Sequence, residues 1–254
     1  KIVSTSQKVV FYFQRIAAIL FLPTLIALSI IMMNDKDEQL AYYKASTPYG
    51  SISEIILPDS SKVWLDVGST LEYPSRFINN TRRVYMCGEA YFEVHADKKH
   101  PFIIQADELE ITATGTAFNV SSFAQSLEQK VTLISGKVSV SQGNKIKYLL
   151  PGQQLTYQRN TKRMTIASID TFKYTAWKDG MFRFRDVRLE EIMRVVERWY
   201  DMTVVYEDEC VKDLHFGFNM SRLETIEPLL NIFELNGKIK ITKEGKVLKI
   251  KRGR

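Results

Sequence analysis

The chain has 254 residues, 45% of them hydrophobic and 25% charged, so it is long enough to bury one large hydrophobic core or two smaller ones. Its net charge of +6 is spread too thinly for a nucleic-acid surface. Residues 1–34 hold three basic and no acidic residues, residues 35–170 hold 15 of each, and residues 171–254 hold 17 basic and 14 acidic. A surface that neutralises about six to ten phosphates needs a denser basic cluster. We therefore expect no direct binding of nucleic acid.

Residues 16–33, IAAILFLPTLIALSIIMM, are 18 residues without a charge. As a helix they would extend about 27 Å, close to the thickness of the hydrocarbon core of a bilayer. Pro23 lies inside this run, and membrane-spanning helices tolerate proline. The pattern predicts a transmembrane helix at 16–33, preceded by a flank at 1–15 and followed by a polar linker at 34–46.

The charges on either side of this run predict its orientation. Lys1, Lys8 and Arg15 precede it and the acidic stretch NDKDEQ follows it, so the flank is expected in the cytoplasm and the rest of the chain outside the membrane. A cleaved secretory signal is the alternative, because basic residues before an apolar run fit it too. No A-x-A-like cleavage site follows Met33, and the run is long for a signal, which favours an uncleaved single-pass anchor.

Residues 47–170 are predicted to form an all-β domain. Short apolar or alternating runs are separated by turn clusters such as PDSS, DKKHP, SGK and QGNK. The runs are ISEIILP, KVWLDV, RRVYMCGEAYFEVHA, PFIIQA, LEITATGTAFNVSSF, QKVTLISGKVSVSQ and KYLLPGQQLTYQ. Such closely spaced strands are typical of a sandwich, a barrel or a solenoid, and no internal repeat selects one of them.

Residues 171–254 are predicted to form a small α+β domain with the order βαββαββ. A helix beginning near Asp186 places an apolar stripe on one face. The stripe consists of Leu189, Ile192, Met193, Val196, Trp199 and Tyr200. A second helix carries Ile226, Leu229, Leu230 and Phe233 on one face. The chain then closes with a hairpin expected to turn at Glu244-Gly245.

Two cysteines, Cys87 and Cys210, lie far apart, which excludes a disulfide framework. The histidines are His95, His100 and His215, and no pair among these five residues has the close spacing of a zinc site. We expect no metal and no cofactor. Burial is the expected state of both thiols.

The carboxylate pair most suggestive of an enzyme is Glu89 and Glu93 in GEAYFEV. Four residues apart on one strand, their backbones would stand about 13 Å apart, whereas glycoside hydrolysis needs carboxyl groups about 5 to 9.5 Å apart. A solvated face opposite buried Ala90, Phe92 and Val94 explains both glutamates. No G-x-S-x-G, Walker or zinc-protease motif occurs, so we do not expect an enzyme that turns over an external substrate.

A membrane-tethered module that binds or processes glycans is the alternative function. It would need a cleft with exposed aromatic side chains and closely spaced carboxylates. The tryptophans are Trp64, Trp177 and Trp199. Their positions are typical of a core, although Trp177 lies at the predicted domain junction and could pack the two domains together.

Several sequence blocks resemble the FecR-type transmembrane anti-sigma regulators, in order and spacing, from about residue 47 to residue 158. They are LPDSSKVWLDVGSTLEYPSRF, RRVYMCGEAYFEV, HPFIIQAD, GTAFNV, VTLISGKVSV and LLPGQQLTY. The later block FRFRDVRLEEIMRVVERWYDMTVVYED resembles the domain that follows in the Bacteroidota branch, which is related to the short N-terminal signalling domain of secretins and TonB-dependent receptors. The chain departs from the family pattern at four positions. Ser60 replaces a usual glycine, Cys87 a small or polar residue, and Ala113 and Thr114 larger aliphatic ones.

The resemblance implies an anti-sigma factor and signal relay. In such regulators a cytoplasmic tail, expected here before Lys1, binds an extracytoplasmic-function sigma factor, and one helix crosses the inner membrane. The periplasmic part contacts the signalling domain of a TonB-dependent outer-membrane transporter. We expect the C-terminal domain to make this contact. The hairpin at 238–251 is a candidate edge for strand addition, unless its alternating lysines guard it against pairing.

The stretch ITATGTAFNV, residues 111–120, reads as a strand with a glycine at its centre. The resemblance implies that the bond between Gly115 and Thr116 is a candidate site of self-cleavage. In that reaction the Thr116 hydroxyl attacks the preceding carbonyl, an N-to-O acyl shift gives an ester, and water hydrolyses it. Gly115 removes a Cβ that would obstruct the intermediate. His95, His100 and Glu110 are the candidate bases.

A purely structural explanation accounts for the same residues. Gly115 would allow a neighbouring strand to approach closely or would form a bulge. Thr116, Phe118 and Val120 would then line the core.

Overall fold

The structure is a computed structural model that describes residues 5–34, 40–78, 80–171, 175–222, 225–235 and 237–253. Two compact units make it up, Lys1–Ala41 and Tyr42–Arg254. Parts of the predicted flank at 1–15 and of the predicted linker at 34–46 lie outside the described residues.

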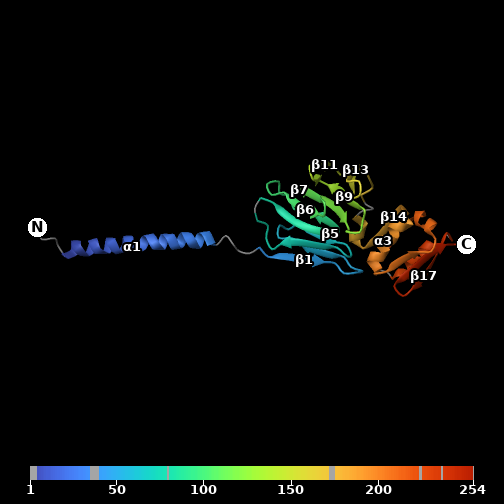
Figure 1. Ribbon diagram of the computed structural model, residues 1–254, viewed down its shortest axis with the longest axis horizontal. Coiled ribbons are helices and arrows are strands. Elements are labelled where there is room, and N and C mark those ends of the chain that lie inside the picture. Colours follow the sequence, from blue (N-terminus) through green and yellow to red (C-terminus); the bar gives the residue numbers. More distant parts are fainter. Residues whose placement is uncertain are drawn as a thin grey trace. The chain divides into compact units, whose positions relative to one another are not determined.

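The described part of the first unit holds the helix α1 (Thr5–Asn34), which includes the whole apolar run (Figure 1). The helix continues through Pro23, and the Thr24 hydroxyl donates to the carbonyls of Leu20 and Phe21, each at 2.9 Å. Among the described residues, no helix combines the length and the apolar character that crossing a membrane requires.

Residues 42–168 form thirteen strands, which confirms the all-β prediction for this part of the chain. The strands are β1 (Tyr42–Ser46), β2 (Ser53–Ile56), β3 (Lys62–Leu65), β4 (Thr70–Pro74), β5 (Arg82–Glu93), β6 (Phe102–Ala106), β7 (Leu109–Ala113), β8 (Ala117–Ser122), β9 (Glu128–Ser135), β10 (Val138–Gln142), β11 (Lys145–Leu149), β12 (Gln153–Gln158) and β13 (Arg163–Ser168). Strand β1 lies in the range predicted as a linker, where it pairs with β4.

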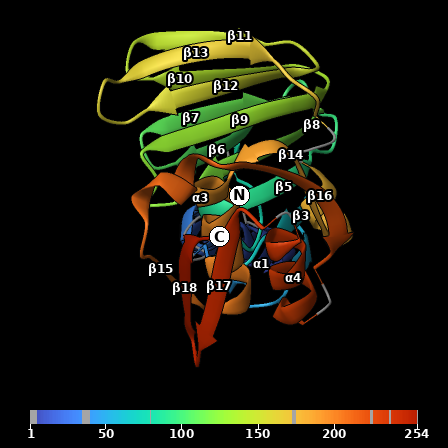
Figure 2. The ribbon, with the colours of Figure 1, turned by 90° about the vertical axis from the view of Figure 1, so that its right-hand side faces the viewer.

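These strands form one continuous sheet that folds into two layers sharing β5 (Figures 1 and 2). One layer has the order β1-β4-β5-β6-β7-β10-β11 and the other β2-β3-β5-β8-β9-β12-β13. Strand β5 changes layer near Gly88, where φ is +104° and a Cβ would lie 2.3 Å from the Ser69 hydroxyl oxygen. The result is a sandwich in which strand pairs alternate between layers along the chain.

The first hydrophobic core lies between the two layers, because side chains alternate between the faces of each strand. Its largest fully buried members include Phe92, Phe102, Phe118 and Tyr157. As predicted, Ala90 and Phe92 of β5 and Val94, which directly follows it, are buried.

The C-terminal part has the predicted order βαββαββ. Its elements are β14 (Met181–Arg188), α3 (Leu189–Tyr200), β15 (Thr203–Tyr206), β16 (His215–Ser221), α4 (Ile226–Glu234), β17 (Ile239–Glu244) and β18 (Val247–Arg252), with the short helices η1 (Ala176–Asp179) and η2 (Glu209–Asp213). Strands β14 and β16 form one sheet, and β15-β18-β17 form another. The predicted apolar stripes of α3 and α4 supply most of a second core, with Tyr200 at its margin.

Two predicted boundaries in this part need correction. Helix α3 begins at Leu189 rather than near Asp186, because β14 continues through a bulge there and Val187 pairs with Phe216. The last hairpin turns at Gly245-Lys246, one residue later than predicted, because Glu244 still pairs with Val247.

The prediction for the cysteines is wrong, since both thiols are exposed. Cys87 shares the outer face of β5 with Tyr85, while Met86 between them points into the core. Cys210 lies in the short helix η2.

Ser60, one of the departures from the family pattern, has φ +68° in the turn between β2 and β3. A glycine adopts this left-handed conformation without strain, which explains the residue usual at this position.

Candidate functional site

The predicted self-cleavage bond lies at a corner between the two layers. The chain leaves β7 in one layer at Ala113 and enters β8 in the other at Ala117, so ITATGTAFNV is not the single strand that the sequence predicted. Gly115 has φ +134°, and a Cβ there would lie 2.8 Å from the Cβ of Ala96. The glycine thus permits the close approach that the structural explanation required. Thr116, at the end of this corner, is 5% exposed.

The Thr116 hydroxyl has no hydrogen-bond partner among the described residues. The backbone around it is held, since the Thr116 carbonyl accepts from the Val94 N–H at 2.9 Å. Gly136 packs against the side chain so closely that a Cβ there would lie 2.5 Å from Thr116 Cγ2. None of the candidate bases forms a hydrogen bond with this hydroxyl: His95, His100 and Glu110. Self-cleavage at this bond therefore stays an untested hypothesis drawn from the resemblance.

A second candidate site, missed in the sequence, is the junction between the β sandwich and the C-terminal part. The second core extends onto the sandwich, because it includes Val67 and packs against Ile52. Residues 42–254 form one compact unit in which the two cores adjoin. The junction buries charges as well as apolar surface.

The central contact of the junction is a buried ion pair. Arg222, which follows β16, donates to Asp66, which follows β3, with Nη1 and Oδ1 2.6 Å apart. Their side chains are 5% and 2% exposed. The guanidinium also lies over the rings of Phe182 and Trp199, 4.9 and 5.1 Å from their centroids. Removing one partner of such a pair leaves a buried charge uncompensated, which costs about 3–5 kcal/mol.

A hydrogen-bonded chain runs beside this pair. The Trp177 indole N–H donates to Asn119 Oδ1 at 3.1 Å, and Asn119 Nδ2 donates to Glu89 Oε1 at 2.8 Å. Burial raises the pKa of Glu89, the negative charge of Asp66 raises it further, and the bond from Asn119 works in the opposite direction. Glu89 is therefore half-buried at the junction and does not lie on the solvated face that the sequence predicted, whereas Glu93 is exposed.

Arg198 of α3 is the second cation of the junction. Its guanidinium lies 4.1 Å from the centroid of the Phe123 ring. Burial lowers the pKa of Arg198, while the nearby carboxylates of Glu89 and Asp66 raise it. The Nε atoms of Arg198 and Arg222 have no hydrogen-bond partner within the described part of the chain. Two carboxylates and two guanidiniums thus meet between the two cores, with Asp66 and Arg222 buried and Glu89 and Arg198 half-buried.

The tryptophans occupy this junction instead of an open cleft. Trp177 and Trp199 are 5% and 3% exposed. Trp64 is half-buried, with Lys178 Nζ 5.5 Å from its ring centroid. The prediction that Trp177 packs the two parts together is confirmed by its bond to Asn119. No observation on these side chains favours the glycan-binding alternative.

Both edges of the C-terminal three-stranded sheet carry a glutamate cap. Glu197 of α3 accepts from the Val204 N–H of β15 at 2.7 Å, and Glu234 of α4 accepts from the Ile241 N–H of β17 at 2.6 Å. Each carboxylate occupies a backbone donor that an added strand would need. Of the hairpin at 238–251, β17 is thus the edge strand, with its pairing groups partly covered, while β18 lies between β15 and β17.

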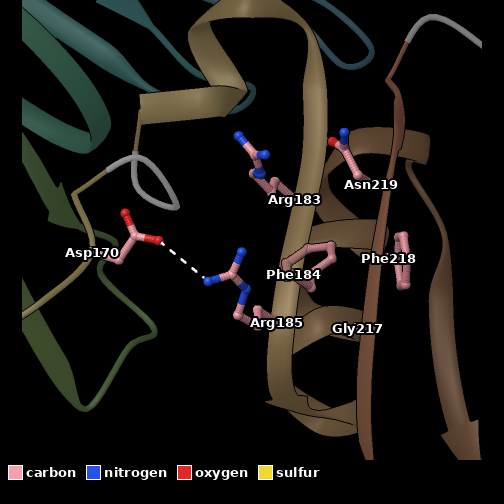
Figure 3. A pocket seen from close by; sticks show the side chains of 7 residues that line it. All are labelled: Asp170, Arg183, Phe184, Arg185, Gly217, Phe218 and Asn219. Carbon is pink, nitrogen blue, oxygen red and sulfur yellow. Dashed lines mark ion pairs between the residues drawn. The ribbon is translucent and has the colours of Figure 1, made fainter.

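A pocket of about 370 Å³ lies on the sheet formed by β14 and β16 (Figure 3). Its lining consists of Asp170, Arg183, Phe184, Arg185, Gly217, Phe218 and Asn219. Arg183 and Arg185 extend from β14 toward the side on which Asp170 lies, and the Arg185–Asp170 ion pair is long, at 3.9 Å. Much of this lining is exposed, so the pocket is an open surface feature.

Comparison with known protein families and structures identifies relatives of this chain. The family described as FecR protein matches residues 43–147, and the one described as FecR, C-terminal, matches residues 181–250. Two crystal structures of a proposed anti-sigma factor from Parabacteroides distasonis ATCC 8503, at 1.65 and 2.50 Å resolution, each show 26% identity and a TM-score of 0.76. Each match covers 84% of this chain and all of the other chain. The comparison with curated proteins finds no match.

Proposed function

Because the chain belongs to the FecR family of anti-sigma factors, we propose that it controls an extracytoplasmic-function sigma factor in response to a TonB-dependent outer-membrane transporter. In this proposal the C-terminal domain, residues 171–254, receives the signal. The sandwich, residues 47–170, passes it toward the membrane. The sigma factor is bound on the cytoplasmic side.

One observation carries the relay: the receiving and transmitting parts share a buried, charged junction. A rotation or withdrawal of the C-terminal part would separate Arg222 from Asp66 and expose Glu89 and Arg198. Such a junction favours two discrete arrangements, docked and separated, over a continuous range, because a partly opened ion pair loses its attraction while its charges stay poorly solvated. A partner that binds the separated arrangement more tightly would shift the balance toward it.

We also propose that α1 anchors the chain in the inner membrane, with its N-terminus in the cytoplasm and the unit Tyr42–Arg254 in the periplasm. The support comes from the sequence, where residues 16–33 lack any charge and basic residues precede them. The helical state of residues 5–34 agrees with this role.

We place the contact with the transporter's signalling domain on the C-terminal part. The glutamate caps bear on how this contact forms. A strand that adds to β17 must displace Glu234 from the Ile241 N–H, and one that adds to β15 must displace Glu197 from the Val204 N–H. Contact through these edges would therefore be conditional on movement of a helix side chain.

The experiment is a transcriptional reporter for each extracytoplasmic-function sigma factor of the host, measured with and without each TonB-dependent transporter that carries a signalling domain. Deleting the gene should change the basal level of one reporter and abolish its response to one transporter. The full chain should restore both. The double variant Asp66→Asn with Arg222→Leu removes the ion pair without leaving an unpaired buried charge, so we expect it to restore the basal level and not the response.

The matched control is the ion pair between Arg83 and Glu110, at 2.9 Å on the outer face of the sandwich with side chains 38% and 37% exposed. Arg83→Leu with Glu110→Gln should restore both the basal level and the response. Deletion of the gene without effect on any reporter would refute the anti-sigma function. A full response from the junction variant would refute the relay through the junction and would leave the anti-sigma function standing.

A further inference from the structure

Strand β11 ends one layer of the sandwich and has a free edge. It pairs with β10 on one side and, among the described residues, with no strand on the other (Figure 2). We call the residues Lys145, Ile146, Lys147, Tyr148 and Leu150 the β11 edge surface. At an edge strand, every second residue directs its backbone N–H and C=O groups away from the sheet.

Three large apolar side chains of this surface are exposed to solvent. Ile146 is 55% exposed, Tyr148 is 74% exposed and Leu150 is 61% exposed. Single exposed apolar residues are ordinary, but three within five residues on an unpaired edge form a feature that natural edge strands usually avoid.

The two edges of the C-terminal sheet show how this protein closes an edge. There, Glu197 and Glu234 occupy backbone donors of β15 and β17. Along β11, the described residues provide no side-chain hydrogen bond to the outward backbone groups of Ile146 and Tyr148. Just beyond the strand, the Leu150 N–H donates to Gln153 Oε1 at 3.0 Å, so Leu150 contributes its exposed side chain to the surface and not a free N–H. The protein closes two edges and leaves this one open.

The charges of the surface suggest what pairs with it. Lys145 and Lys147 are exposed, and neither forms an ion pair with a described residue. Because side chains alternate along a strand, the two lysines lie on one face of β11, and Ile146 and Tyr148 lie on the other. In a strand added to β11, the side chains on one face would lie beside the two lysines. The side chains on its other face would lie beside Ile146 and Tyr148.

We propose that the β11 edge surface binds an extended segment of another protein, which adds as a strand and carries acidic residues alternating with apolar ones. The acidic residues lie beside Lys145 and Lys147, and the apolar residues lie beside Ile146 and Tyr148. This surface lies on the sandwich, away from the elements that the proposed signalling contact uses, so it adds an interaction to that function and does not depend on it.

A second copy of the chain fits this edge poorly. Pairing of β11 with β11 would bring the lysines of both copies into the same row, and like charges opposite each other destabilise a sheet. A lipid surface fits poorly as well, because it offers no backbone groups to pair with the free N–H and C=O groups.

The test uses a fluorescent, end-capped hexapeptide of alternating glutamate and valine, titrated against the full chain in detergent and followed by anisotropy. The control peptide has lysine in place of glutamate. We expect the glutamate peptide to bind, more weakly as salt is raised, and the lysine peptide to bind at least about tenfold more weakly. Two further versions of the glutamate peptide are methylated on the backbone nitrogens, one at every odd residue and one at every even residue. At least one of them should fail to bind, because strand addition needs the N–H groups on the side of the peptide that faces β11.

The decisive variant reverses the charges of the edge. Lys145→Glu with Lys147→Glu should exchange the preference, so that the lysine peptide binds and the glutamate peptide does not. The matched control is Lys240→Glu with Lys251→Glu, a cross-strand pair of exposed lysines on the C-terminal sheet, which should leave both affinities unchanged. Circular dichroism confirms that each variant is folded.

Three results would overturn the proposal. Equal binding of both methylated glutamate peptides and the unmethylated one would mean charge attraction without strand addition. Unchanged peptide preference in the Lys145→Glu, Lys147→Glu variant would place the binding elsewhere. A dimer in light scattering that dissociates in Tyr148→Ser would make a second copy the occupant of the edge.

Discussion

Gly115 shows what a single residue contributes to this fold. The corner between β7 and β8 brings Gly115 against Ala96, and no side chain fits in that space. The sequence could predict a close approach, because glycine interrupts an apolar strand pattern there. It could not predict the partner, since Ala96 belongs to a loop whose path depends on tertiary contacts. Among these, Arg82 donates to the carbonyls of His95 and His100 at 3.0 and 2.8 Å.

The Gly115–Thr116 bond can be tested directly by blotting both termini of the full chain after expression. We expect a single intact band, because no described base contacts the Thr116 hydroxyl and the Thr116 carbonyl is held by Val94. Thr116→Ala should give the same band. Two fragments in the wild type that disappear in Thr116→Ala would instead establish the self-cleavage that the family resemblance implies.

At the scale of elements, alternation and helical periodicity predicted most strands and both C-terminal helices. The misassigned boundaries share a physical cause. Strands β7 and β8 read as one run because a two-layer corner needs only three residues, Thr114 to Thr116. Helix α3 starts late because a bulge lets β14 continue past Asp186. A local pattern carries little information on where a strand changes layer.

The glutamate caps lead to an element-scale prediction. Glu197→Ala and Glu234→Ala should each lower the free energy of unfolding by about 1–2 kcal/mol, because each leaves a partly buried strand N–H without its charged acceptor. Alanine favours a helix, so helix propensity works against this loss and does not cause it.

The measurement is urea-induced unfolding of the full chain. Glu54→Ala, at an exposed position of β2, serves as the control and should change the free energy by less than about 0.5 kcal/mol. If the two cap variants behave like Glu54→Ala, the caps do not stabilise these edges.

For the whole molecule, the sequence predicted two folded parts and not the way they join. Asp66 and Arg222 are 156 positions apart, and each follows a strand that seemed complete by itself. Glu89 alternates with buried residues as a solvent-facing residue would, but η1 and α3 bring Trp177 and Arg198 to that face and leave Glu89 half-buried. Trp177 was the one signal of a junction, because a large aromatic residue stood between two predicted domains.

The half-buried Glu89 predicts how the stability of the whole unit depends on pH. Its pKa is raised in the folded state, so the folded chain binds more protons than the unfolded chain between the ordinary glutamate pKa of 4.5 and the raised pKa. The contribution of Glu89 to stability therefore falls as pH rises through that window and stays low above it. Asp66, Arg198 and Arg222 are the charged groups that act on Glu89, Asp66 raising its pKa and the two arginines lowering it.

Glu89→Gln should remove this dependence, because glutamine keeps an oxygen to accept from Asn119 and cannot ionise. We expect the variant to exceed the wild type in free energy of unfolding by more than about 0.5 kcal/mol at pH 8, and the difference to shrink as pH falls toward 4.5. Urea unfolding at a series of pH values measures it, with exposed Glu93→Gln as the control on the same strand. A difference that stays constant over this range would mean that Glu89 titrates alike in both states, and that the C-terminal part does not cover it in solution.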